Sequence, residues 1–195
     1  ALGYRAVFVR GNADRAVIEL SRHGRATERP RDEWMVAQHS PAAVDFLAGF
    51  GFTAIVDVNE LGPVRFCHGS PRSDTEVITP RTPAGRFAQL AAGIAEATLV
   101  SGHTHIQFDR RVAGRRSVNP GSVGLPYHES EPGTAYWALL GPDVHLRQTR
   151  YDVAESLARG ARVGDPSAEV IANYLTTPPT SAEVTTQAEG LVFSD

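Results

Sequence analysis

The 195-residue chain is 42% hydrophobic and 21% charged, which excludes the weakly hydrophobic, highly charged class of disordered proteins. Its formal net charge is −3 and all nineteen basic residues are arginine, so no strong positive field favours nucleic acid as an obligatory partner. The single cysteine cannot form an intramolecular disulfide, and no apolar run reaches the ~18 residues of a membrane helix. We therefore expect one soluble protein of a reducing compartment, the cytoplasm, with no membrane partner.

The first half of the chain alternates predicted strands and helices. Runs of β-branched and aromatic residues, each bounded by turn residues, predict strands at 5–10, 52–57, 64–68 and 98–101. Apolar residues at helical spacing predict one helix over 40–50 and another that opens at Thr82, the expected N-cap. This alternation is typical of an α/β fold.

The second half begins with consecutive strands. They are predicted at 106–112, 116–118, 134–140 and 144–150, and the turns between them indicate antiparallel pairing. Helical patterns return at 152–161 and 166–175. The end of the chain is rich in Thr, Pro, Ser and Glu, so we expect one domain over 1–176 and a flexible tail over 177–195.

Three loops that follow predicted strands carry side chains able to bind metal. They are Gly11-Asn12, His68-Gly69 and Gly102-His103-Thr104-His105. Ligand sites of open α/β sheets lie where parallel strands end, so we expect these loops to gather at one edge. Imidazole nitrogens and an Asn oxygen suit Mn, Fe, Zn or Ni, and His103 and His105 can point toward two adjacent ions. Each feature alone is also ordinary capping or turn chemistry, but their ordered co-occurrence favours a metal site.

Four motifs in this order carry a family resemblance: GNAD (11–14), HGSP (68–71), SGHTH (101–105) and NPGSVGLP (119–126). They resemble the calcineurin-like metallophosphoesterase superfamily, and within it the small single-domain bacterial and archaeal phosphodiesterase branch. The resemblance implies a four-layer α/β/β/α sandwich with two divalent metal ions, Mn first and Fe, Ni, Zn or Mg as alternatives. It implies that Asn12, His68 and His103 bind the second metal and that His105 binds the first. The substrate would be a small phosphorylated or phosphodiester compound, hydrolysed by a metal-activated water.

The sequence departs from this family pattern in two places. No Asp-x-His or Gly-Asp motif precedes the GNAD segment, and Gly164-Asp165 lies too late to serve. We therefore expect both motifs and the first strands of the sandwich upstream of Ala1, and the chain as given to be weakly active or inactive. Ala13 stands where many members have a histidine that acts as the general acid. His128, in the loop after the NPGSVG segment, is the candidate proton donor in its place. Without a strong donor, diesters with good leaving groups are favoured.

Other functions fit the sequence less well. The same fold also serves as a non-catalytic protein-binding scaffold with a degraded metal site, but the four metal-ligand candidates are intact here. A serine-hydrolase elbow over 120–124 lacks its first glycine and its strand-to-helix context. Cys67 and His68 are neighbours on a strand, so their side chains point to opposite faces and cannot easily pair as a nucleophile and its base.

Overall fold

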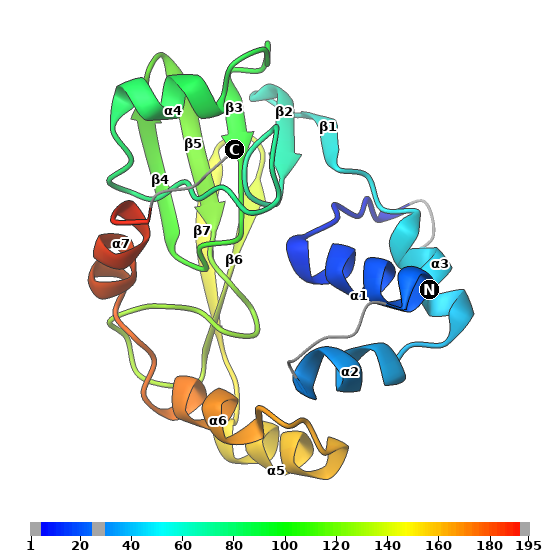
Figure 1. Ribbon diagram of the computed structural model, residues 1–195. Coiled ribbons are helices and arrows are strands. Elements are labelled where there is room, and N and C mark those ends of the chain that lie inside the picture. Colours follow the sequence, from blue (N-terminus) through cyan, green and yellow to red (C-terminus); the bar gives the residue numbers. More distant parts are fainter. Residues whose placement is uncertain (1–4, 25–29, 192–195) are drawn as a thin grey trace.

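The computed structural model describes residues 5–24 and 30–191 and arranges them as two β-sheets with helices around them (Figure 1). The helices are α1 (Asn12–His23), α2 (Pro30–Ala37), α3 (Pro41–Ala48), α4 (Ala84–Leu90), α5 (Val153–Val163), α6 (Ala168–Thr176) and α7 (Ser181–Glu189). The strands are β1 (Thr53–Val58), β2 (Gly62–Cys67), β3 (Thr98–Val100), β4 (Gln107–Val112), β5 (Arg115–Pro120), β6 (Thr134–Leu140) and β7 (Val144–Arg150). The α/β fold class is confirmed. Within the described ranges, no helix combines the length and the apolar character needed to cross a bilayer.

The larger sheet has five strands in the order β1-β2-β3-β5-β4. Strands β2, β3 and β5 run parallel, whereas β1 and β4 pair antiparallel at the two edges. The three parallel strands therefore end on the same side. Their ends lead into His68, into the 101–105 loop and into the 121–126 loop. Two of the three loops expected to gather, at His68 and at 102–105, therefore lie at this edge.

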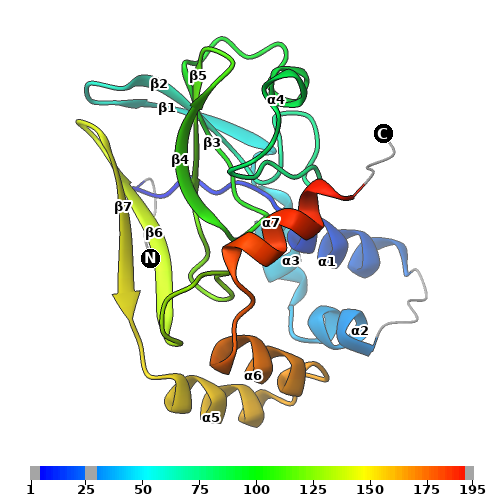
Figure 2. The same ribbon diagram turned by 90° about the vertical axis from the view of Figure 1, so that its left-hand side faces the viewer.

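The two faces of this sheet are buried against different layers (Figure 2). Side chains alternate along a strand, and in β3 Leu99 belongs to one apolar cluster while Val100 belongs to the other. The Leu99 cluster includes Phe87 and Leu90 of α4 and is extended by Val184 of α7. The Val100 cluster is covered by Leu140, Val144 and Leu146 of the β6–β7 hairpin, which forms the second sheet. Two sheets thus stack face to face, with helices on the outer side of the larger one.

The predicted strand at 5–10 is wrong. The segment makes only one parallel bridge, between Val9 and Gly51, with two backbone hydrogen bonds. Phe8 instead packs its ring against Phe46 and Phe50, with ring centroids 5.4 and 4.7 Å apart. Aromatic packing beside α3 thus takes the place of a strand ladder.

The predicted loop at 11–14 is the first turn of α1. The Asp14 carboxylate accepts the backbone N–H of Gly11 at 2.8 Å, which satisfies a donor at the helix start. Helix α1 packs on α2 and α3 through a small separate cluster of Val17, Ile18 and Val44. Asn12 is therefore the first residue of a helix, and its backbone is fixed by that helix.

The expected flexible tail over 177–195 contains an ordered helix, α7, and residues 192–195 of it lie outside the described ranges. Glu189 explains this difference, because its carboxylate accepts the hydroxyl groups of Thr79 and Thr82, each at 2.6 Å. Thr82 is thereby engaged away from α4, which starts one residue later than predicted with Pro83 as its N-cap. A long-range carboxylate contact therefore helps to hold the end of the chain.

We expect Glu189→Ala to lower the free energy of unfolding by about 1–3 kcal/mol, because two buried threonine hydroxyls lose their charged acceptor. Residues from 177 onward should also be cleaved faster by a protease under native conditions. Gln187→Ala, at an exposed position of the same helix, is the matched control and should leave both measurements unchanged. Equal cleavage of the two variants would contradict this account.

Candidate metal centre

Three of the four predicted metal ligands meet at the edge where the parallel strands end. Asn12 begins α1, His68 follows β2, and His103 lies in the loop after β3. The Asn12 Oδ1 atom is 2.8 Å from His68 Nε2, and this nitrogen is 3.2 Å from His103 Nδ1. An amide oxygen and two imidazole nitrogens, from residues 56 and 35 positions apart along the chain, are thus brought together.

His105 lies beside this cluster without a hydrogen bond to it. Its Nδ1 is 2.8 Å from the Leu125 carbonyl, which can only accept, so Nδ1 carries the proton and Nε2 keeps its lone pair. Its ring stacks on Tyr127, with centroids 5.5 Å apart and planes inclined by 23°. His105 is nevertheless close enough that its charge would lower the pKa of both His68 and His103.

The loop that carries both histidines has a left-handed backbone. His103 has φ 61° and His105 has φ 59°, a region that non-glycine residues rarely adopt and that is often found at functional sites. The fully buried Asn119 holds this loop, since its amide donates to the Gly102 carbonyl at 2.8 Å and to Thr104 Oγ1 at 3.0 Å. This explains structurally why the NPGSVGLP motif accompanies the histidine motif.

Burial sets the charge state of the cluster. It lowers the pKa of His68 and His105, and it lowers the pKa of His103 to about 4 with help from the two neighbouring imidazoles. At neutral pH all three rings are therefore uncharged, which is the state that a metal ligand requires.

Sequence reasoning missed a carboxylate that acts on this cluster. Asp74, in the loop after β2, opposes the lowering of the pKa of both His68 and His103. It also accepts two hydrogen bonds from Arg15 of α1, at 2.6 and 3.1 Å. The pair ties α1 to the loop that follows His68, and its members are 59 residues apart, so no local motif reveals it.

These pKa shifts predict a loss of stability on mild acidification. A histidine with a lowered pKa in the folded state stabilises fully above its ordinary pKa of 6.5, and this contribution is lost as the pH falls toward the folded value. We expect the Tm of the metal-free protein to fall between pH 6.5 and 5, a window above the ordinary carboxylate pKa values. His103→Gln should flatten this slope. A Tm that is constant across the window in the parent chain would contradict the prediction.

The predicted proton donor, His128, is not brought into contact with the cluster. It is buried, its Nδ1 accepts the Ser130 backbone N–H at 3.0 Å, and its ring packs on Tyr136. Its backbone N–H donates to the Pro179 carbonyl. These contacts show that His128 contributes to packing and hydrogen bonding in this part of the fold. Its role as a proton donor stays a prediction.

Cys67 lies in the apolar cluster below α4, and burial raises the pKa of its thiol to about 12. A thiol in this state carries no nucleophilic charge at neutral pH. The structure therefore agrees with the small hydrophobic role that its strand position predicts.

The family model of the calcineurin-like phosphoesterase superfamily domain matches residues 3–140 of this sequence. The chain belongs to the calcineurin-like phosphoesterase superfamily. Within the superfamily, a metallophosphoesterase from Sphaerobacter thermophilus superposes with a TM-score of 0.68 at 23% identity, covering 88% of this chain and 76% of that one. The hypothetical protein PH1004 from Pyrococcus horikoshii OT3 superposes with a TM-score of 0.71 at 16% identity, covering 89% of this chain and 73% of that one. At these identities the likeness shows the fold. No curated protein sequence matches the chain.

The donor atoms of the cluster fit a divalent metal of the kind that this superfamily generally binds. Two ligands that are ~2.1 Å from one ion and at right angles to each other are about 3 Å apart, close to the observed separations of 2.8 and 3.2 Å. Within the described part of the chain, no three His, Cys, Asp or Glu side chains are grouped so that they alone could hold an ion. A mixed set of amide and imidazole ligands is what it offers.

Proposed function

We propose that this protein is a metal-dependent phosphoesterase that hydrolyses phosphodiester or phosphomonoester bonds at a dinuclear site. The observation that carries the proposal is the convergence of Asn12, His68 and His103 within 2.8–3.2 Å in a chain of the calcineurin-like superfamily. These three residues would hold one ion, and the free Nε2 of His105 would serve the other. When bound, such ions act as Lewis acids and lower the pKa of water.

The surrounding residues orient and protect these ligands. The Leu125 carbonyl fixes the tautomer of His105, and the Thr75 backbone hydrogen-bonds to His103. Ala13 follows Asn12 in the first turn of α1, and its side chain carries no proton that it could donate. We therefore favour phosphodiesters with good leaving groups over unactivated monoesters as substrates.

The first test is metal binding. We would titrate the chain with Mn²⁺ in a calorimeter and compare it with His103→Ala, using His23→Ala at the far end of α1 as the matched control. We expect His103→Ala to weaken binding at least tenfold and His23→Ala to have no effect. Equal affinity of the parent chain and His103→Ala would refute the assignment of the site.

The second test is hydrolysis of bis(4-nitrophenyl) phosphate with Mn²⁺. It is run on this chain and on a form to which the Asp-x-His and Gly-Asp motifs of the family have been added, so that their carboxylates can complete the ligand set. Metal-dependent hydrolysis that His103→Ala abolishes supports the enzyme. Metal binding with no hydrolysis in either form favours the non-catalytic scaffold instead.

A further inference from the structure

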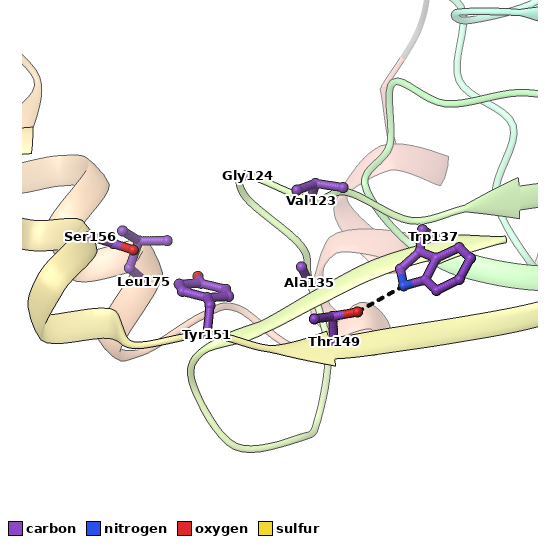
Figure 3. Close-up of a pocket in the computed structure, with 8 residues that line it drawn as sticks. All are labelled: Val123, Gly124, Ala135, Trp137, Thr149, Tyr151, Ser156 and Leu175. Atoms are coloured by element: carbon purple, nitrogen blue, oxygen red, sulfur yellow. Dashed lines mark hydrogen bonds between the residues drawn. The ribbon is translucent and has the colours of Figure 1, made fainter. Parts of the chain in front are cut away.

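An apolar pocket of about 610 Å³ lies between the outer face of the β6–β7 hairpin, the 121–126 loop and helices α5 and α6 (Figure 3). In Figure 3, Trp137 and Thr149 border one end, Ser156 and Leu175 border the other, and Val123 and Gly124 border it from the loop. The volume is in the range of small-molecule sites, ~300–1,000 Å³.

The chemistry of the walls selects the class of ligand. No residue that lines the pocket carries a charge. The Trp137 indole N–H donates to Thr149 Oγ1 at 3.0 Å, so its polar edge is already satisfied and its ring is left for apolar contact. Tyr151 supplies a second aromatic ring. Two rings in an uncharged cavity suit a planar aromatic group and disfavour a phosphate group itself.

The pocket and the candidate metal centre share one loop. Gly124 lines the pocket, and the next residue, Leu125, accepts the hydrogen bond from His105. Gly124 and Leu125 are consecutive, with Cα atoms about 3.8 Å apart. The pocket wall therefore lies next to the residue that orients His105. The loop is anchored on both sides, because the Ser122 carbonyl accepts from the Tyr136 N–H at 2.9 Å and Ser122 Oγ accepts from the Leu125 N–H at 3.1 Å.

We propose that this pocket binds the organic group of the substrate and that the substrate is a phosphate ester of a planar, uncharged aromatic group. The inference rests on the proposed function, since the phosphate group is assigned to the metal centre. The charges explain this assignment. Metal ions bound by the neutral imidazoles at the strand ends would attract the anionic phosphate, whereas the uncharged pocket would bind the apolar group.

Two substitutions change the pocket in opposite ways. Gly124→Leu adds a bulky side chain at the pocket wall, and the fold should tolerate it because a Cβ at this position meets no atom within 4 Å and the backbone is not left-handed. Trp137→Ala removes the larger ring. Leu139→Ala is the matched control: Leu139 is on the same face of β6, is 50% exposed and does not line the pocket.

The experiment compares phenylphosphonate with methylphosphonate, whose C–P bonds are not hydrolysed, by calorimetry in the presence of Mn²⁺. We expect the parent chain and Leu139→Ala to bind the phenyl compound about tenfold more tightly, and Gly124→Leu and Trp137→Ala to lose this preference. NMR signals of the two tryptophan indole N–H groups, assigned with the Trp34→Phe variant, show directly where the phenyl group binds. Only the phenyl compound should shift the Trp137 signal.

The outcomes separate this inference from the proposed function. Equal affinity for both phosphonates in the parent chain, with an unmoved Trp137 signal, overturns the pocket while the metal centre stands. A Trp137 shift with phenylphosphonate that is independent of Mn²⁺, with no binding of methylphosphonate, overturns the metal centre while the pocket stands. Binding of neither compound overturns both.

Discussion

Replacing Gly11 with alanine is expected to weaken metal binding by ~10–100-fold, the range for changes next to a ligand, while the protein stays folded. A Cβ on Gly11 would lie 2.9 Å from Nδ1 of His68 and 3.0 and 3.1 Å from two further atoms of the same ring. The first distance is shorter than real Cβ contacts and the other two are unusually tight, so the imidazole must shift. His68 is the centre of the cluster, since its Nε2 faces both Asn12 and His103, and a displaced ring breaks both contacts together.

The fold should tolerate this change. Gly11 has φ −98°, which alanine adopts without strain, and the Asp14 carboxylate can still accept its N–H. Loss of a glycine at this helix start costs at most about 1 kcal/mol. Gly102→Ala is the matched control in the neighbouring loop, because its Cβ would be 3.6 Å from the His68 carbonyl, an ordinary contact. Calorimetry with Mn²⁺ and thermal unfolding would be measured for both. Unchanged affinity of Gly11→Ala would show that His68 does not need its present position.

The strand ends that carry the site could be predicted from the sequence. Strand β2 is followed by His68-Gly69 and strand β3 by Ser101-Gly102-His103. A short, largely apolar run before such a loop is typical of a parallel strand whose two faces are covered. The order of strands then decides where the loops meet. His68 and His103 could thus be predicted as neighbours from the sequence alone.

The long-range contacts that hold α1 beside the site and α7 against the sheet could not be predicted, because they join residues distant in sequence. Arg15 with Asp74 and Glu189 with Thr79 are 59 and 110 residues apart, and neither pair leaves a local pattern. Helix α1 was missed for a different reason: Gly11-Asn12 has the composition of a turn, and the capping contact from Asp14 that starts a helix there depends on backbone geometry.

Asn119→Asp is expected to lower the free energy of unfolding by about 3–5 kcal/mol, the cost of an uncompensated buried charge, and to release the loop that holds His103. The Asn119 side chain is fully buried, and its amide donates to the Gly102 carbonyl and to Thr104 Oγ1. A carboxylate keeps the acceptor for the Gly121 N–H, at 2.9 Å, but brings its second oxygen against the Gly102 carbonyl. Repulsion therefore replaces attraction at the point where the left-handed backbone of His103 needs support.

The same substitution at Asn173, an exposed position of α6, is the matched control and should change the free energy of unfolding by less than ~0.5 kcal/mol. Urea unfolding measures the stability of both variants, and a Mn²⁺ titration measures the site. Asn119→Ala separates charge from hydrogen bonding: it should lose metal affinity as Asn119→Asp does but lose less stability, since no buried charge is introduced. If Asn119→Asp binds Mn²⁺ as tightly as the parent chain, the left-handed loop holds its own shape, and Asn119 supports the fold rather than the ligands.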